Sequence, residues 1–410
     1  MRLPLLIALL AMLAPSLSPA RADPSLDKRF ETFLEEEIWP QAKASSVPRE
    51  IFEAAFATAA LDLDLPDLIL PGASEPVERI NFQAEFRNGS DYLSERAVGA
   101  TVAGGRTLLE RHARLIAEIE ARYGVPGPIL VSIWGRESSF GKAAIPHDVF
   151  SVLGTKAFLS RRKEMFRKEL IAALKIAANG DRQVSEMKSS WAGALGQPQF
   201  MPSKFLDYAV DFDGDGKRDI WSSVPDTLAS IANYLKSHGW VAGRDWGFEA
   251  RFPQTVSCTM EGPDKGRPIA DFVADGVARV SGRPFPEHEV AAEGHLLMPA
   301  GRTGPAFVAT RNFYVLKTYN NSDLYALFVG HAADRMAGSG KLATGWTPTD
   351  ALTRGDVAEL QRRLVARGHD VGGVDGLAGF KTRRAIGAVE KELGRSETCW
   401  PSRALLAELD

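Results

Sequence analysis

Glu137 is the residue whose surroundings in the sequence most favour acid–base chemistry. It follows the apolar run 129–134, Ile-Leu-Val-Ser-Ile-Trp, and precedes Ser138 and Ser139. A carboxyl group set among apolar side chains loses solvation, so its charged form is disfavoured and it becomes a candidate general acid near neutral pH. Many glutamates, however, simply end helices in solvent. The segment therefore leaves two hypotheses open, a desolvated acid and an exposed surface residue.

The acidic segment 211–217 has the spacing of a metal-binding loop. Aspartates occupy alternate positions and a glycine follows at 216, as in the first half of an EF-hand calcium loop. The ligands would be Asp211, Asp213, Asp215 and Lys217, the last through its backbone carbonyl. The bidentate glutamate expected at the twelfth position is replaced by Ser222. The alternative is an acidic turn that holds sodium or water.

The composition indicates a globular protein of two or three domains. The chain has 410 residues, 45% apolar and 25% charged, with 49 basic and 52 acidic side chains and a net charge of −3. These values exclude a disordered or collagen-like chain, and the near-neutral balance argues against a nucleic-acid binder. Two cysteines, Cys258 and Cys399, are too few for a disulfide scaffold or a cysteine-built zinc site.

The N-terminus has the pattern of an export signal. Arg2 precedes the apolar run 3–13, and the small residues of Ala20-Arg21-Ala22 follow, so we expect cleavage after Ala22. A membrane anchor is the alternative, but the run is shorter than the ~20 residues that a spanning helix needs. Because no later segment is long and apolar enough to span either, we expect a soluble protein in an exported, oxidising compartment once residues 1–22 are removed.

The hydrophobic pattern behind this signal is mostly helical. Apolar residues recur at helical spacing over 27–56 with an interruption at Trp39-Pro40, and over 106–123, 128–134, 158–178 and 226–237. Between about 248 and 315 the pattern changes to short β-like pieces, such as 277–280 and 307–310. A linker rich in Gly, Ser, Thr and Pro follows at 341–349, and a compact tail occupies 350–410. We therefore predict an α+β fold that is mostly helical.

Five motifs follow one another along the chain. They are Glu-Ser-Ser-Phe-Gly at 137–141, Ser-Arg-Arg at 160–162, the glycine-rich 191–203, the stretch 208–216 running on to 233–240, and 312–325. Together they resemble the membrane-bound lytic murein transglycosylase B family, lysozyme-like enzymes that cut peptidoglycan. The resemblance covers residues 27–340. It implies a lysozyme-like catalytic domain at 23–340, in which the β-rich part at about 248–315 is an insertion.

The resemblance implies that Glu137 is the single catalytic acid/base. It would protonate the bond between N-acetylmuramic acid (MurNAc) and N-acetylglucosamine (GlcNAc), and would then take the proton of the MurNAc C6 hydroxyl as that oxygen closes onto C1. The substrate's own hydroxyl replaces the second carboxylate of most glycosidases, the product is a 1,6-anhydro sugar, and no cofactor is required. The nearest later acid, Asp148, is expected to be structural. A true hydrolase (muramidase) and a non-catalytic wall-binding or scaffolding protein are the alternatives.

The resemblance also implies a glycan cleft. Its residues would be Ser190, Gln199, Phe200, Tyr319, Asn320, Tyr325, Arg161 and Arg162. Polar side chains would hydrogen-bond the sugars, aromatic rings would pack on sugar faces, and the arginines would meet lactyl or peptide carboxylates. For Phe200, packing in the core is an equally open interpretation. In the acidic loop, the family implies that a later aspartate, here Asp226, closes a structural calcium site with a role in stability.

The tail also carries a set of ordered motifs. An amphipathic helix at 352–368 is followed by short motifs within 374–386. This order resembles the small three-helix peptidoglycan-binding domain, from whose pattern Ala378, Phe380 and Cys399 depart. A helical appendage that only stabilises the enzyme is the alternative.

The resemblance places the mature protein in the periplasm. Glycan strands are its expected partner, together with cell-wall synthesis proteins, and neither nucleic acid nor a membrane span is expected. Cys258 lies in the expected catalytic domain and Cys399 in the tail. The oxidising compartment would allow them to pair, but two free thiols are favoured because the cysteines belong to different domains.

Overall fold

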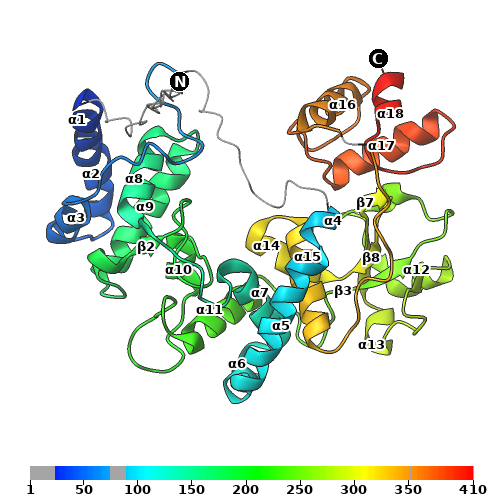
Figure 1. Cartoon of the computed structure of the whole chain (residues 1–410), viewed down its shortest axis with the longest axis horizontal. Helices are drawn as coiled ribbons and strands as arrows, with labels where there is room; N and C mark the ends of the chain where they lie inside the picture. The colour runs from blue at the N-terminus through cyan, green and yellow to red at the C-terminus, as the bar shows by residue number, and fades with distance from the viewer. Residues whose placement is uncertain (1–23, 74–88, 351, 410) are drawn as a thin grey trace, which may run out of the picture.

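The structure is a computed structural model that describes residues 24–73, 89–350 and 352–409. It is mostly helical, as the hydrophobic pattern predicts, and its described residues include a two-stranded and a five-stranded sheet (Figure 1). The first and the last helices of the chain lie at opposite sides of the molecule (Figure 1). The expected signal at 1–22 and its cleavage site lie outside the described residues. In the part of the chain that is described, no helix combines the length and apolar character that a bilayer crossing demands.

The first helical region confirms the predicted helix at 27–56 but breaks at a different place. It consists of α1 (Pro24–Phe33), a π-helical turn η1 (Leu34–Ile38), α2 (Trp39–Ala44) and α3 (Arg49–Phe56). Pro40 does not end the helix, because it lies in the first turn of α2, where the missing N–H of a proline is tolerated. The break comes at 45–48 instead, where Ser46 has a φ of 62°.

The next helices form the centre of the main hydrophobic core. They are α4 (Gly89–Tyr92), α5 (Glu95–Arg111), α6 (Ala113–Tyr123) and α7 (Gly127–Ser138). The predicted helix at 106–123 is in fact two helices, since α5 begins earlier and His112 separates it from α6. Helix α6 ends at Gly124, whose φ of 74° is the left-handed conformation common after helices. Leu130 and Ile133 of α7 are fully buried, so this helix runs through the core.

Two further helices, α8 (Val149–Leu159) and α9 (Lys163–Ala178), pack against each other. The sequence predicts one helix at 158–178, but Ser160 is extended and divides it. Segment 61–70 packs against α8. The remaining elements of this region are β1 (His147–Asp148), η3 (Val184–Glu186), β2 (Lys188–Ser189), α10 (Pro202–Tyr208) and α11 (Val224–Ser237).

The β-rich part forms a five-stranded antiparallel sheet, which confirms the predicted strands near 277–280 and 307–310. The strand order is β4–β6–β8–β3–β5. Its strands are β3 (Gly247–Arg251), β4 (Arg267–Pro268), β5 (Ala278–Arg279), β6 (Glu293–Leu297) and β8 (Ala306–Ala309). A further strand, β7 (Pro299–Arg302), packs beside β8. The short helices η4 (Cys258–Met260), α12 (Ile269–Ala274) and α13 (Glu287–Val290) connect them. The sheet buries its own hydrophobic cluster, distinct from that of the helices.

After the sheet the chain returns to the main core in α14 (Arg311–Asn320) and α15 (Asp323–Met336). Helix α15 packs on α5 and α7. A buried hydrogen bond of 2.9 Å from the Ser132 hydroxyl to the Val329 carbonyl joins α7 to α15. These two helices are therefore fixed to each other by both apolar and polar contacts.

Residues 352–409, called the C-terminal unit below, form three helices around their own core. They are α16 (Arg354–Ala366), α17 (Phe380–Glu392) and α18 (Arg403–Glu408). A capping box of Thr353 and Asp356 begins α16. The unit lies beside β7 and the sheet (Figure 1). The expected linker at 341–349 is itself attached, since Trp346 packs on the main core and Thr347 N donates to Thr303 O at 2.7 Å.

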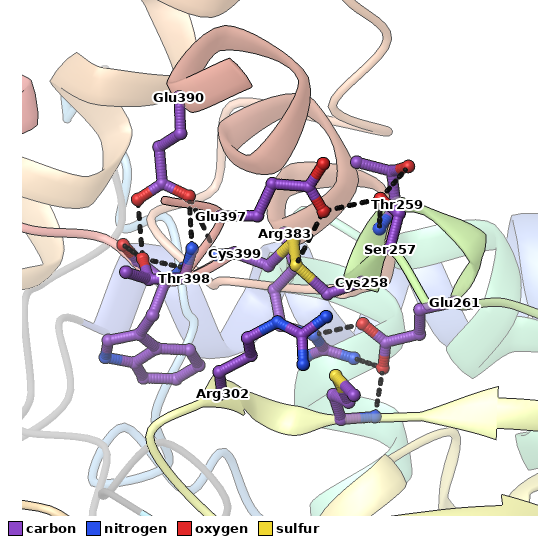
Figure 2. Close-up of a disulfide and its surroundings, with 12 residues drawn as sticks. Ser257, Cys258, Thr259, Glu261, Arg302, Arg383, Glu390, Glu397, Thr398 and Cys399 are labelled. Carbon is purple, nitrogen blue, oxygen red and sulfur yellow. Dashed lines mark hydrogen bonds and ion pairs between the residues drawn. A yellow bond between two sulfur atoms is a disulfide. The ribbon is translucent and has the colours of Figure 1, made fainter. Parts of the chain in front are cut away.

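The two cysteines form a disulfide, so the expectation of two free thiols is wrong (Figure 2). Cys258 and Cys399 are 141 residues apart in the sequence, but the packing of α17 on η4 brings their Cα atoms to 6.2 Å. Gly387 of α17 faces the bond, where a Cβ would collide with the sulfur of Cys399. The disulfide therefore joins the C-terminal unit covalently to the β-rich part.

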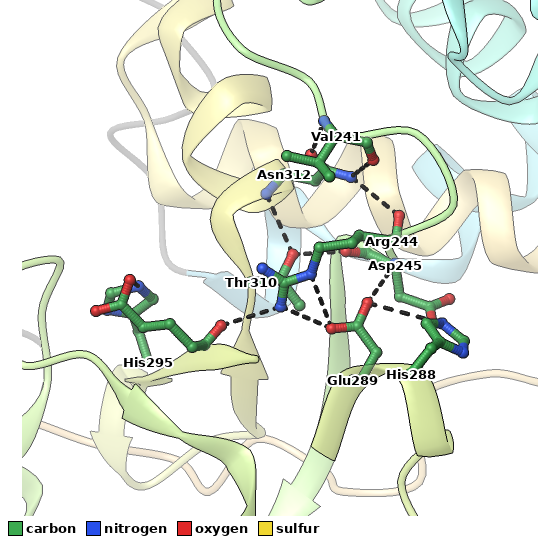
Figure 3. Close-up of polar contacts among 9 residues, drawn as sticks. Val241, Arg244, Asp245, His288, Glu289, His295, Thr310 and Asn312 are labelled. Atoms are coloured by element: carbon green, nitrogen blue, oxygen red, sulfur yellow. Dashed lines mark hydrogen bonds and ion pairs between the residues drawn. The ribbon is translucent and has the colours of Figure 1, made fainter. Parts of the chain in front are cut away.

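A polar cluster ties the turn after α11 to the sheet and to α14 (Figure 3). Arg244 Nε and Nη2 donate to the same oxygen of the buried Glu289, at 2.9 and 2.6 Å. Asn312 of α14 accepts a hydrogen bond from Val241 N at 2.8 Å and donates one to Arg244 O at 2.9 Å. The turn is therefore held by Glu289 on one side and by Asn312 on the other. These contacts also fix the start of α14.

Candidate active site

Glu137 lies in the last turn of α7 and is partly buried. The helix ends there because Ser139 and Phe140 adopt left-handed conformations, with φ of 50° and 63°. Its carboxylate Oε1 accepts a hydrogen bond of 2.5 Å from the hydroxyl of Tyr325 in α15. The candidate acid and one tyrosine of the expected cleft, which are far apart in the sequence, are therefore in direct contact.

The glycine-rich loop at 191–203 holds the end of α7 in place. Gln197 Oε1 accepts a hydrogen bond of 2.7 Å from the indole N–H of Trp134, one turn before Glu137. Gly141, with a φ of 77°, lies so close to Gln197 that a Cβ would collide with its amide. Sequence reasoning missed Gln197 as a site residue. Its place inside the glycine-rich motif is the signal that could have found it.

Tyr325 is held in a single orientation by the elements around it. The hydroxyl of Ser322 caps α15 and accepts a hydrogen bond from Tyr325 N at 3.3 Å. The ring of Tyr319 is stacked on that of Tyr325, with centroids 6.1 Å apart and planes 10° from parallel. Tyr319 in turn donates from its hydroxyl to Pro198 O at 2.8 Å. The tyrosine pair thus links α14, α15 and the glycine-rich loop around Glu137.

The electrostatics of the site keep both phenols neutral. Burial raises the pKa of Tyr319 and of Tyr325 well above the ordinary value of 10.0, and the charge of Glu137 adds to the effect on each. A protonated phenol can donate a hydrogen bond, whereas a phenolate cannot. Tyr325 is therefore a fixed donor to the carboxylate of Glu137.

Phe200 belongs to the core beneath this site. It is 1% exposed and packs between Tyr234 and Tyr319, with ring centroids at 5.8 and 6.0 Å. Of the two interpretations open from the sequence, core packing is the one that fits its position, because its ring has no free face for a sugar. Phe200 therefore packs against Tyr319 on the side of the core.

Ser190, directly before the glycine-rich loop, and Gln199, within it, are partly exposed. Ser190 Oγ accepts backbone hydrogen bonds from Ala192 at 3.3 Å and Ala194 at 3.2 Å. Gln199 has a φ of 54°, and its Nε2 donates to Gly196 O at 2.9 Å. Both side chains therefore use part of their hydrogen-bonding capacity to shape the loop.

Arg161, Arg162 and Asn320 are exposed. The arginines lie in the turn between α8 and α9, where Arg162 packs over the ring of Phe166 at 5.4 Å. Asn320 is the last residue of α14, directly after the buried Tyr319. The arginines thus come from elements other than those that carry Glu137 and Tyr325.

Asp148, the next acid after Glu137, is structural, as expected. Its carboxylate accepts a hydrogen bond of 2.9 Å from Ser151 N and caps the start of α8. The carboxylate of Asp148 thus already accepts a hydrogen bond from the first turn of α8. Asp148 is therefore a poor candidate for the second carboxylate of a hydrolase.

Two aspartates of the acidic loop and one of α11 gather around one point. Oxygens of Asp211, Asp213 and Asp226 lie within 4.8 Å of one another. Asp211 also accepts backbone hydrogen bonds from Gly214 and Gly216 at 2.7 and 2.9 Å, which gives the loop its tight turn. Three carboxylates at this spacing fit a hard divalent cation such as calcium.

The other two candidate aspartates, Asp215 and Asp226, differ in burial and in their contacts. Asp226 is fully buried, and burial raises its pKa, with the charge of Asp213 adding to the effect. Asp215 is exposed and accepts a hydrogen bond from Lys217 N at 2.9 Å. Asp226 therefore joins the gathered group although it lies outside the EF-hand spacing, whereas the carboxylate of Asp215 contacts the backbone of Lys217.

A second group of possible metal ligands, Asp245, His288 and Glu289, lies near the sheet (Figure 3). Arg244 occupies one oxygen of Glu289, and Asp245 N donates to the other at 2.9 Å. A guanidinium on the same carboxylate repels a cation. This cluster is therefore a salt-bridged structural joint.

Comparison with known proteins identifies relatives of the chain. The family model described as Transglycosylase SLT domain matches residues 29–334. Membrane-bound lytic murein transglycosylase B of Escherichia coli strain K12 is 34% identical over 224 residues, which are 52% of this chain and 58% of that protein. The chain thus spans little more than half the length of this curated relative.

Solved structures resemble the whole arrangement. SltB3 from Pseudomonas aeruginosa, in complexes with NAG-anhNAM-pentapeptide and with NAG-NAM-pentapeptide, is 40% identical at a TM-score of 0.81. That match covers 93% of this chain and 99% of SltB3. The soluble lytic transglycosylase SltB1 of the same organism is 30% identical at a TM-score of 0.58, over 75% of this chain and 97% of that chain.

Proposed function

Because the chain belongs to the Transglycosylase SLT domain family, we propose that it is a lytic transglycosylase of peptidoglycan. It cleaves the bond between MurNAc and GlcNAc and leaves 1,6-anhydro-MurNAc ends. The contact between Glu137 and Tyr325 is the observation that carries the proposal, because it places one carboxyl group on a fixed phenol donor. The related SltB3 binds a fragment with an anhydro sugar, which supports the same product here.

In the proposed reaction, Glu137 first donates its proton to the glycosidic oxygen, and the bond from that oxygen to C1 of MurNAc breaks. The C6 hydroxyl of the same sugar then forms a bond to C1 and gives its proton to the Glu137 carboxylate. The residue ends as it began, and no water is consumed. An attacking group within the substrate gains from proximity, and one residue acts as acid and then as base.

Tyr325 has a defined part in this cycle. Its hydroxyl donates to Oε1 of Glu137 and thereby orients the carboxyl group that exchanges the proton with the substrate. A donor at 2.5 Å also stabilises the carboxylate formed after the first step. Tyr325 thereby orients Glu137 and does not itself give up a proton, since its pKa is raised.

The test is mass spectrometry of the fragments released from purified peptidoglycan. We expect anhydro-MurNAc ends from the wild type, and a loss of rate of about 10³-fold in Glu137→Gln. Glu118→Gln is the matched control, because Glu118 is an exposed glutamate in α6 paired with Arg114. Reducing ends would instead indicate a hydrolase. No release with intact wall binding would indicate a wall-binding protein.

The C-terminal unit is proposed as a wall-binding module of the same enzyme. Its three helices around a separate core support this, as does the motif order at 352–386. We place the mature enzyme in the periplasm after removal of residues 1–22. In sedimentation with purified peptidoglycan, a variant cut after 350 is expected to bind less than the full chain.

The acidic loop is proposed to bind a structural calcium ion. Asp211, Asp213 and Asp226 would supply carboxylate oxygens, and Lys217 its backbone carbonyl. The ion would join the loop to the start of α11, which carries Asp226. It takes no part in the chemistry at Glu137.

A further inference from the structure

A buried ion network lies where the C-terminal unit meets the helices of the catalytic site. Arg383 of α17 is 3% exposed and Glu261, which follows η4, is fully buried. The guanidinium donates to both oxygens of Glu261, at 2.8 and 2.6 Å (Figure 2). Met298 N donates to the same carboxylate at 2.8 Å. This bidentate pair fixes the guanidinium of Arg383 against the sheet.

The same guanidinium reaches the helix that carries Tyr325. Arg383 Nη2 lies 3.3 Å from Asp323 Oδ2, and Lys317 Nζ of α14 lies 2.7 Å from Asp323 Oδ1. Asp323 is the first residue of α15, two residues before Tyr325. The carboxylate thus meets one cation from the C-terminal unit and one from α14, at the turn between the two tyrosines.

Apolar and covalent contacts flank this network, and its inner pair, Arg383 and Glu261, is buried. The ring of Phe380, the first residue of α17, lies 5.9 Å from Lys317 Nζ and fills the space above Gly262. The disulfide and Gly387 hold α17 against η4 nearby. The bidentate pair of Arg383 and Glu261 is strongly directional, because both groups are buried and water does not readily replace their hydrogen bonds when the geometry changes.

We propose that Arg383 is a positioning residue for the reaction at Glu137, because the C-terminal unit holds the start of α15 through Arg383 and Asp323 and thereby sets the Tyr325 hydroxyl on the Glu137 carboxylate. The inference deepens the proposed function and rests on it. It makes the C-terminal unit a part of the catalytic apparatus, in addition to any binding of the wall.

Chemistry gives a reason why charged groups occupy this junction. A buried ion pair often contributes no more stability than a well-packed apolar pair, so stability alone does not require Arg383. An apolar contact, however, would tolerate small rotations of α15. A displacement of about 1 Å at a catalytic group can cost up to about 10²-fold in rate, so a directional anchor is valuable two residues before Tyr325.

The test separates positioning from folding. Arg383→Met alone leaves the carboxylate of Glu261 buried without its partner, so it also destabilises the protein. The double variant Arg383→Met/Glu261→Gln removes that charge and restores the melting temperature. On soluble glycan strands, we expect the double variant to lose about tenfold in kcat with KM within about twofold of the wild type.

Two further variants complete the experiment. Asp323→Asn, with Arg383 intact, removes the same link from the other end and is expected to lose about tenfold in kcat. The triple variant should lose no more than either, because both changes break one connection. Arg384→Met is the control, since Arg384 neighbours Arg383 but pairs with the exposed Asp264 at 2.7 Å. Its kcat should equal that of the wild type.

The outcomes distinguish the two proposals. Wild-type kcat in the folded double variant, or in Asp323→Asn, would overturn the positioning role and leave the transglycosylase intact. Losses that multiply to about 100-fold in the triple variant would also overturn it. If the wild type itself released no anhydro products, the proposed function would fail first. A raised KM with unchanged kcat would make Arg383 a substrate-binding residue instead.

Discussion

The junction at the C-terminal unit and the acidic loop both use carboxylates, but in opposite ways. At the junction, Glu261 and Asp323 meet Arg383 and Lys317, so negative and positive groups are present together. In the loop, oxygens of aspartates lie within 4.8 Å of one another. Each carboxylate at the junction therefore has a cationic partner, whereas Asp211, Asp213 and Asp226 bring like charges together.

The pKa shifts express the same contrast. Burial acts to raise the pKa of Asp323, but Lys317 and Arg383 outweigh it and bring the pKa below the ordinary value of 3.8. For Asp226, burial raises the pKa, and the neighbouring charge of Asp213 increases the effect. Burial acts to raise the pKa of both aspartates, and the sign of the nearest charges decides whether that effect is opposed or reinforced.

The largest expected effect tests whether the junction depends on its covalent bond as well as on its charges. Replacing both Cys258 and Cys399 by Ala should lower the free energy of unfolding by about 4 kcal/mol, since a bond across 141 residues strongly restricts the unfolded chain. Urea unfolding of the oxidised wild type and the variant measures this. Reducing agent should weaken the wild type and leave the variant unchanged. A difference below about 1 kcal/mol would show that the noncovalent contacts hold the unit without the bond.

The second prediction concerns the acidic loop and is smaller. Calcium should raise the free energy of unfolding by about 2.7 kcal/mol at a free concentration of a hundred times its Kd. The melting temperature in chelator and in calcium, at constant ionic strength, measures the shift. Asp226→Asn should lose most of it, while Asp215→Asn should lose less, because Asp215 lies outside the gathered group. Equal melting temperatures in both buffers would contradict the comparison.

The smallest expected effect concerns a carboxylate outside both regions, Asp334 of α15. It accepts a hydrogen bond of 3.1 Å from a neutral donor, the indole of Trp246, and burial raises its pKa to about 7. The folded state therefore holds this proton more tightly than the unfolded chain, whose aspartate titrates near 3.8. The resulting stability is complete below the unfolded value and is lost as the pH rises to about 7.

Asp334→Asn removes this titration and keeps an acceptor for the indole. Relative to the wild type, the variant should gain about 1 kcal/mol between pH 5 and pH 8, since residual water contact reduces the full linkage value. Thermal melting of both proteins over that range measures it. If the melting temperatures of the two proteins change in parallel with pH, Asp334 does not become a buried charge. The contrast between paired and unpaired carboxylates would then not extend to Asp334.

What could be predicted from the sequence depended on distance along the chain. The acidic loop was readable because Asp211, Asp213 and Asp215 alternate within one short segment, whereas Asp226 was expected only through the family resemblance. The helices followed from their apolar spacing, although His112 and Ser160 divide two of them at places where the apolar pattern continues. Local backbone conformation, which hydrophobic periodicity does not report, decides such breaks.

The candidate site was also predictable only where its residues are close in the sequence. Glu137 stood out by its apolar surroundings. Tyr325, 188 residues away, was expected in the cleft only through the family resemblance, and its contact with Glu137 was not predicted. The pairing of Arg383 with Glu261, across 122 residues, has no sequence signal, because each looks like an ordinary surface residue of a helix or turn. The cysteine pair was misjudged for the same reason, since their separation hides the packing of α17 on η4.

The disulfide also gives the chain a closed topology. From Cys258 to Cys399 the backbone forms a covalent ring, and α14, α15 and the stretch at 337–341 lie inside it. Residues 337–341 are exposed, so a protease can reach the ring there. One cut at this point would leave two pieces joined through sulfur, with Tyr325 on one piece and Arg383 on the other. Such a nicked enzyme keeps both in place, and separates into fragments only when it meets a reductant.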